Sequence, residues 1–286
     1  MKITAIIVIL LFLSSIVVYS LYNSSKDEIF VGWRSSEYGY QQEQQPSYWV
    51  EFSNEMSSKI QGSIASGIWI LGSRDGERDC NLNFPGNFEY HNIAFSQDDM
   101  SEEYLTVFDR NNLKVWLQVE PADADVETLI RLVLDRYSNH DSVIGFGIDV
   151  EWLNSADNFE GRLVTESEVS EWLHLIKTYK PEYKLFLKHW DYEKLPSNYP
   201  EDVVFICDSQ GFESYHEMLE EFRKWGEHFS DAEVAFQFGY EADRKIWEQF
   251  EESASKIGND ILETVPNTVG LYWVDFTITE IFKVKN

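Results

Sequence analysis

Two carboxyl groups at alternate positions, Asp149 and Glu151, end the apolar segment 142–152. Side chains alternate along a β-strand, so both groups would point to one side while Ile148 and Val150 face the other. At ~3.3 Å per residue their Cα atoms would lie about 6.6 Å apart, close enough for each group to affect the protonation of the other. One of the two can then stay protonated and serve as an acid.

A protonated carboxyl group near a second one is the arrangement that glycoside hydrolysis uses. One group gives a proton to the leaving oxygen, and the other stabilises positive charge or orients a nucleophile. We therefore expect a carbohydrate-active hydrolase with Asp149 and Glu151 as its catalytic residues.

Eight short apolar segments rich in β-branched and aromatic residues predict strands. They are residues 29–34, 63–72, 113–120, 142–152, 183–190, 202–209, 233–240 and 269–276. Amphipathic stretches predict helices at 48–60, 101–111, 125–137, 166–179, 214–229 and 243–257. Thr165 and Glu168 form a capping box before one helix, and 191–199, with Pro196, predicts a loop with one turn. This alternation predicts an α/β fold, a single (β/α)8 TIM barrel over residues 29–286.

Polar and aromatic side chains follow nearly every predicted strand, at the end where such barrels carry their catalytic groups. The candidates for substrate binding are Trp33, Arg34, Gln118, Glu120, Lys188, Trp190, Asp208, Gln210, Gln237, Tyr240, Trp273 and Asp275. Buried polar groups are costly unless they face a solvated site or pair with one another. The alternative is therefore an ion-paired network, such as Lys188 with Glu120 or Asp208, that closes the barrel mouth. The aromatic residues of this list, and Trp152 in addition, would either stack on sugar rings or fill the core.

The segment FGIDVEW (146–152) resembles the fourth-strand signature of the chitinase-like glycoside hydrolases, and its Asp-x-Glu ending is similar to that of the barrel-type lysozymes. The resemblance implies that Glu151 is the general acid and Asp149 its partner. The chitinase pattern has further aspartates upstream on the same face, where this chain has Gly145 and Gly147. That departure argues against the substrate-assisted mechanism of chitinases.

The first 20 residues place one lysine ahead of a long apolar run, which indicates an export signal. Val18 and Ser20 suit cleavage after Ser20, so we expect release, with an uncleaved membrane anchor as the alternative. Residues 21–28 form a linker, and no later segment is long and apolar enough to cross a bilayer. We expect a secreted or extracytoplasmic protein that contacts a membrane only through its N-terminal segment.

The net charge of −27 argues against nucleic acid as a partner, because a phosphate backbone is bound by a basic face. A neutral or cationic partner fits better, and we expect a polysaccharide or oligosaccharide bound by a monomer. Cys80 and Cys207 are too few for a disulfide scaffold, although one bridge is compatible with the sequence.

Two other classes of protein stay open. A metal-dependent hydrolase would gather Glu120, Asp149, Glu151, Asp208 and Asp275 around calcium or magnesium. A carbohydrate-binding barrel without catalysis fits the missing upstream aspartates. The sequence has no zinc-protease motif, no serine-hydrolase motif and no glycine-rich phosphate loop, so we expect no cofactor and assign no metal ligand.

Overall fold

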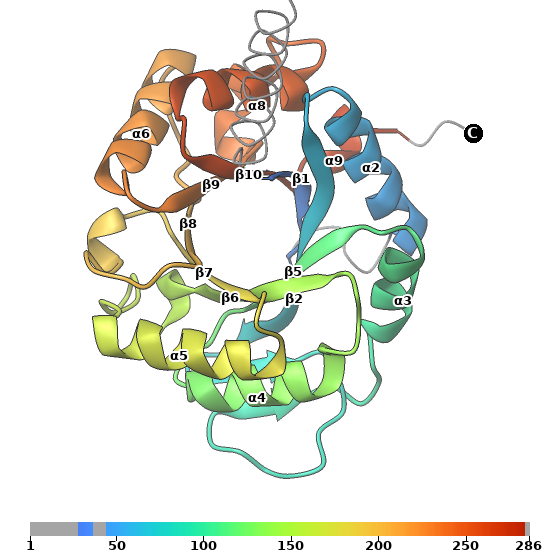
Figure 1. The fold of residues 1–286 in the computed structure, drawn as a ribbon, viewed down its shortest axis with the longest axis vertical. Helices are drawn as coiled ribbons and strands as arrows, with labels where there is room; N and C mark the ends of the chain where they lie inside the picture. Colours follow the sequence, from blue (N-terminus) through green and yellow to red (C-terminus); the bar gives the residue numbers. More distant parts are fainter. Residues whose placement is uncertain (1–27, 37–43, 284–286) are drawn as a thin grey trace, which may run out of the picture.

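The computed structural model describes residues 28–36 and 44–283, which form a barrel of strands surrounded by helices (Figure 1). The expected export segment at 1–20 and almost all of the linker at 21–28 lie outside the described residues. Within the described ranges, no helix is both long enough and apolar enough to cross a membrane.

Eight parallel strands close into a barrel, as the sequence predicted. They are β1 (Ile29–Arg34), β2 (Ser63–Asp75), β5 (Lys114–Val119), β6 (Val143–Asp149), β7 (Lys184–His189), β8 (Val203–Cys207), β9 (Glu233–Phe238) and β10 (Thr268–Val274). Strand β1 pairs with both β2 and β10 and so completes the circle. The carboxyl ends of all eight strands therefore meet at one face of the barrel.

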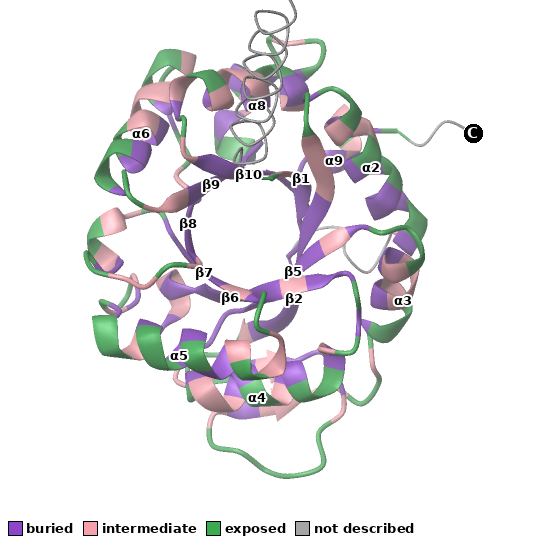
Figure 2. Ribbon diagram, viewed as in Figure 1, coloured by how far each residue is buried: buried purple, intermediate pink, exposed green. Residues whose placement is uncertain are grey.

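Helices pack around the barrel with their apolar sides inward (Figure 2). They are α2 (Pro46–Ser58), α3 (Glu102–Arg110), α4 (Val126–Tyr137), α5 (Glu166–Tyr179), α6 (Tyr215–His228), α7 (Arg244–Trp247), α8 (Ser253–Thr264) and α9 (Ile278–Ile281). Short 3-10 helices follow three strands: η1 (Val150–Trp152), η2 (Tyr192–Lys194) and η3 (Glu241–Asp243). The capping box of Thr165 and Glu168 is confirmed at the start of α5.

Two expectations about the helices have different outcomes. The loop after the fifth barrel strand is confirmed, since 191–199 contains only the turn η2. The single helix expected at 243–257 is wrong, because the chain breaks between α7 and α8. At this break the hydroxyl of Ser253 donates to the carbonyl of Trp247 at 2.6 Å and ties the end of α7 to the start of α8.

A small extension of the sheet was not predicted. Strand β2 continues to Asp75 and pairs antiparallel with β3 (Asp79–Leu82), which pairs in turn with β4 (Ile93–Phe95). The added strands pair with the carboxyl-terminal part of β2, which contains Arg74. Arg74 therefore lies at the same end of the barrel as the candidate catalytic residues.

The interior of the barrel is filled by large side chains that face glycines. Trp116 and Phe186 pack edge to face, with ring centroids 5.4 Å apart. A Cβ atom on Gly147 would lie 2.0 Å from Phe186 Cζ, and one on Gly145 would lie 2.5 Å from Trp116 Cζ3. Real atoms do not approach so closely, so only glycine at these two positions admits the rings. Packing of the barrel therefore accounts for the glycines in place of aspartates.

Both cysteines are free and buried, on different strands. Burial raises the pKa of each thiol above its ordinary value, so Cys80 and Cys207 remain protonated and contribute apolar volume to the core.

Candidate active site

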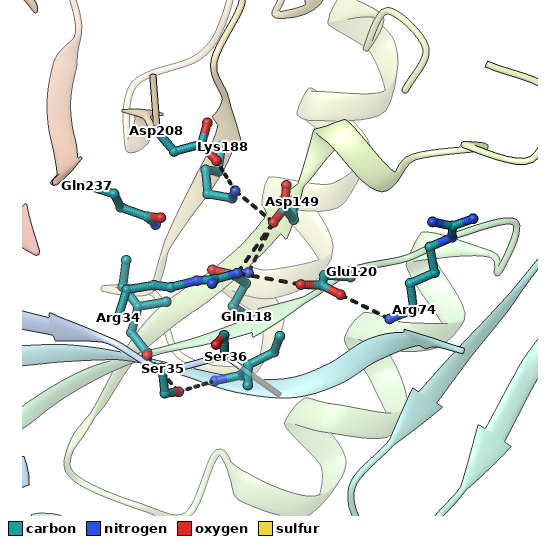
Figure 3. A network of polar contacts seen from close by, with 12 residues as sticks. Arg34, Ser35, Ser36, Arg74, Gln118, Glu120, Asp149, Lys188, Asp208 and Gln237 are labelled. Carbon is teal, nitrogen blue, oxygen red and sulfur yellow. Dashed lines mark hydrogen bonds and ion pairs between the residues drawn. The ribbon is translucent and has the colours of Figure 1, made fainter. Parts of the chain in front are cut away.

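The ammonium group of Lys188 lies between two carboxyl groups at the carboxyl end of the barrel (Figure 3). Its Nζ is 2.9 Å from Asp149 Oδ2 and also donates to Asp208 Oδ2. Lys188 and Asp149 are register partners of β7 and β6, so the pairing of the strands sets their separation. None of the three exposes more than 6% of its side chain. An ion-paired network at the barrel mouth was expected to join Lys188 to Glu120 or to Asp208. The structure shows the pair with Asp208.

Arg34 at the end of β1 joins the same network. Its Nη2 lies 3.5 Å from Glu120 Oε1 and 3.8 Å from Asp149 Oδ2. The amide of Gln118 donates to Asp149 Oδ2 at 3.4 Å, and the backbone N–H of Arg74 donates to Glu120 Oε2 at 3.1 Å. One oxygen of Asp149 therefore receives both cations and an amide. The network links five barrel strands, β1, β2, β5, β6 and β7, and reaches the end of β8 through Asp208.

Glu151 lies beyond the end of β6, in η1, and not on an extended strand. The premise that strand alternation aligns it with Asp149 is wrong, because β6 ends at Asp149. The two groups still interact: burial raises the pKa of Glu151 to about 7, and Asp149 adds to the rise while Lys188 opposes it. Among the described residues the carboxyl group of Glu151 forms no hydrogen bond or ion pair, and its residue is only partly buried.

Two further groups of the network have perturbed protonation. Burial raises the pKa of Glu120 to about 7, with a contribution from Asp149 and an opposing one from Arg34. Burial also raises the pKa of Asp149, despite the neighbouring cations. Burial acts to lower the pKa of Lys188, but Asp149 and Asp208 outweigh it and hold that pKa well above its ordinary value. The lysine stays charged, while Glu120, Asp149 and Glu151 all keep a proton more readily than exposed carboxyl groups do.

The remaining polar candidates line the opposite side of the barrel mouth. Asp275 accepts from the backbone N–H of Ser36 at 2.8 Å and from its hydroxyl at 2.9 Å. Burial raises the pKa of Asp275 to about 6, although Arg34 opposes this. The hydroxyl of Tyr240 donates to Gln237 Oε1 at 3.1 Å, and both residues are buried. Asp275, directly after β10, is therefore held by the loop after β1, and Tyr240 orients the amide of Gln237.

The aromatic candidates separate into two groups. Trp33 and Trp273 are fully buried in the layer between barrel and helices, where Trp33 contacts Trp49 and Trp273 contacts Trp247. These two rings belong to the core, out of reach of a sugar. Trp190 is 39% exposed at the end of β7.

Other side chains complete the rim of the site. The guanidinium of Arg74 lies over the ring of Trp152, 4.9 Å from its centroid. Gln210 is exposed and outside the network. Sequence reasoning missed Arg74 and Ser36, because Arg74 depends on the unpredicted extension of β2 and Ser36 lies in a loop without a pattern.

Several buried polar atoms of the network form no hydrogen bond with the described residues. They are Arg34 Nε, Gln118 Oε1, Asp149 Oδ1, Asp208 Oδ1 and Gln237 Nε2. A buried polar atom without a partner costs free energy, so this concentration marks a place built to receive polar groups from outside the chain.

The acidic residues do not converge as ligands of a cation. Within the described ranges, no group of three or more histidine, cysteine, aspartate or glutamate side chains is placed to hold a metal ion. The position between Asp149 and Asp208 is taken by the ammonium of Lys188. This geometry weakens the metal-dependent alternative.

Comparison with known proteins supports the fold. No family model matches the chain, and no curated protein matches it. Endo-1,4-beta-mannanase from Eisenia fetida aligns with a TM-score of 0.50 at 11% identity, over 87% of this chain and 85% of that one. A GH2 beta-galacturonidase from Eisenbergiella tayi aligns with a TM-score of 0.49 at 13% identity, over 87% of this chain and 44% of that one. At 11% identity the likeness to the mannanase supports the barrel architecture alone.

Proposed function

We propose that this protein is a carbohydrate-active hydrolase that cleaves an extracellular or cell-wall polysaccharide by carboxyl acid–base chemistry. The observation that carries the proposal is Glu151: a partly buried carboxyl group with a pKa of about 7 and no partner among the described residues, beside an ionic network. Such a group is half protonated at neutral pH and free to give its proton to a leaving oxygen. A barrel shared with enzymes such as a mannanase is compatible with this chemistry.

In this proposal Glu151 is the general acid and Asp149 its partner. Asp149 is held by Lys188, Arg34 and Gln118, so its position is fixed. In this role it would stabilise the positive charge that develops on a sugar. Trp190 offers an exposed ring for stacking on the apolar face of a sugar. Gln237, oriented by Tyr240, presents its Nε2 to a substrate oxygen.

The test is release of reducing ends from chitin, peptidoglycan, and neutral and amino-sugar polysaccharides. The chain from Leu21 onward is compared with Glu151→Gln, which keeps the shape of the side chain but cannot supply an acidic proton. Glu251→Gln is the control, because Glu251 is exposed and the change in charge is the same. We expect loss of activity by at least about 10²-fold in Glu151→Gln alone. Equal activity in all three proteins would remove Glu151 from the mechanism.

A carbohydrate-binding barrel without catalysis is the second candidate. The observation that favours it is the filling of the barrel by Phe186 and Trp116 against Gly147 and Gly145, where the chitinase pattern has acidic side chains. Glycan binding with no release of reducing ends from any member of the panel would support this candidate and contradict the first.

A further inference from the structure

Four carboxyl groups surround two cations at the centre of the site. Arg34 and Lys188 supply the positive charges, and Glu120, Asp149, Glu151 and Asp208 supply the acidic groups. Each cation is shared: Arg34 contacts two carboxyl groups, and Lys188 contacts two. The site therefore has more acidic groups than cations, and burial together with this excess raises the pKa values of Glu120, Asp149 and Glu151.

The unpaired atoms show where further positive charge would be received. Asp149 and Asp208 each direct Oδ2 toward Lys188, and each has an Oδ1 that is buried and without a hydrogen bond to the described residues. In Figure 3 the second oxygen of both groups points away from the ammonium. Asp149 is completely buried, whereas 6% of the side chain of Asp208 is exposed, so a ligand would reach the pair through Asp208.

A primary ammonium group matches this arrangement. It supplies three N–H donors and one positive charge, so it can serve both unpaired carboxylate oxygens and still bind a third acceptor. A hydroxyl group brings no charge, and a carboxylate would face Asp149 and Asp208 directly. The unpaired donors, Arg34 Nε and Gln237 Nε2, suit neutral oxygens such as sugar hydroxyls.

We infer that Asp208 and Asp149 form a subsite for the ammonium group of a sugar with a free amine, so that the substrate is a de-N-acetylated amino-sugar polymer. This inference rests on the proposed function. The net charge of the chain, −27, also favours binding of such a polymer, because it attracts a polycation over a long range at low salt. N-acetylation would remove the charge and add bulk at the nitrogen, and uronic acids would be repelled.

The test measures binding separately from cleavage. Glucosamine and galactosamine tetrasaccharides, and the N-acetylated form of each, are titrated into the chain from Leu21 by calorimetry, at low temperature and over short times. We expect the free-amine form of one sugar to bind at least about tenfold more tightly than its N-acetylated form. We also expect this preference to weaken as salt is raised from ~0.05 to 0.5 M.

Asp208→Asn is the informative variant, because it removes the charge and retains the shape. It should abolish the preference for the amine over the N-acetylated form, while Glu251→Gln should leave that preference unchanged. Thermal unfolding of each variant shows whether it is folded, and Asp208→Glu should restore part of the preference. Equal binding of amine and N-acetylated forms, no binding of either, or a preference that survives in folded Asp208→Asn would overturn the inference.

The outcomes separate this inference from the proposed function. An amine preference that depends on Asp208, without release of reducing ends from any polymer, would retain the subsite and contradict the hydrolase. Hydrolysis that depends on Glu151 but makes no distinction between free and acetylated amines would retain the hydrolase and contradict the subsite.

Discussion

Lys188 Nζ lies 2.9 Å from Asp149 Oδ2, with no more than 4% of either side chain exposed. The same ammonium also binds Asp208, just beyond the end of β8, so one lysine compensates two acidic groups. Arg34 contacts only one of them, Asp149, at 3.8 Å. Buried charges are tolerated only while their partners remain in place.

Lys188→Met should lower the free energy of unfolding by about 3–5 kcal/mol, because it leaves Asp208 buried without its cation and Asp149 with only the more distant Arg34. Urea denaturation gives the value. The matched control is Lys256→Met, which removes an exposed pair with Asp260 on α8 and should cost no more than about 1 kcal/mol. If the two variants lose similar amounts, the buried network contributes little to stability.

Activity of the proposed hydrolase should decrease as the pH rises above about 7. Glu151 has a pKa of about 7 and must be protonated to act as an acid, so the active fraction is lost as it ionises. The pH dependence of kcat/KM on a soluble oligosaccharide measures this limb. A rate that stays constant from pH 6 to about 9 would assign the proton to another group.

Stability should also decrease with rising pH. Glu120 titrates at about 7 in the folded protein and has an ordinary value of 4.5, so its folded pKa is raised. Because this pKa is raised, Glu120 contributes fully to the free energy of unfolding below pH ~4.5, and its contribution is lost as the pH rises through about 7. Each such group accounts for a loss on the order of 3 kcal/mol.

Urea denaturation between pH 5 and about 8 follows this loss, and Glu120→Gln should make the curve flatter, because the amide does not ionise. Glu77→Gln, at an exposed residue, should keep the slope of the unmodified protein. An unchanged slope in Glu120→Gln would show that Glu120 does not titrate in this range.

Gly147→Ala should destabilise the barrel by at least about 1–3 kcal/mol, since the new methyl group would overlap the ring of Phe186. Phe186→Leu in the same chain should recover part of the loss, because the smaller side chain vacates the position. A double-mutant cycle measures this coupling. Strictly additive effects would mean that the two positions do not meet.

Replacement of the buried Trp33 and of the exposed Trp190 by alanine should affect stability and glycan binding in opposite ways. Trp33→Ala should cost about 3–5 kcal/mol in unfolding free energy, because it leaves a cavity between β1 and α2. Trp190→Ala, at a ring 39% exposed, should change stability by less than about 1 kcal/mol and weaken glycan binding about tenfold. Thermal melts and calorimetric titrations distinguish the two effects.

The barrel was predictable because each of its strands is a short, nearly continuous apolar run, as expected for a sheet buried on both sides. Strand β3 was missed because its polar residues, such as Asp79 and Asn81, break the apolar pattern, and it pairs only with the extension of β2 and with β4. Strand β4, Ile93–Phe95, is apolar but only three residues long. At the break between α7 and α8 the hydroxyl of Ser253 binds the carbonyl groups of Trp247 and Phe250, a local arrangement that the apolar periodicity of the segment did not reveal.

The site was predictable in its acidic and basic residues and less so in its aromatic ones. Trp33 and Arg34 are adjacent on β1, so alternation allows only one of them to face the barrel mouth, and the structure shows that it is Arg34. The position of Glu151 depended on where β6 ends, and strand ends are the least certain feature of a sequence pattern.

The sharing of Lys188 between two strands also constrains how this chain can change over generations. Replacing Lys188 alone leaves Asp208 without its cation and Asp149 with only the more distant Arg34, so that single step passes through a less stable protein. Loss of the lysine therefore requires earlier substitution of its carboxyl partners, or a stabilising change elsewhere beforehand. Among descendants of this sequence, Lys188 is expected to persist as long as Asp149 and Asp208 do, even where the loops around them diverge.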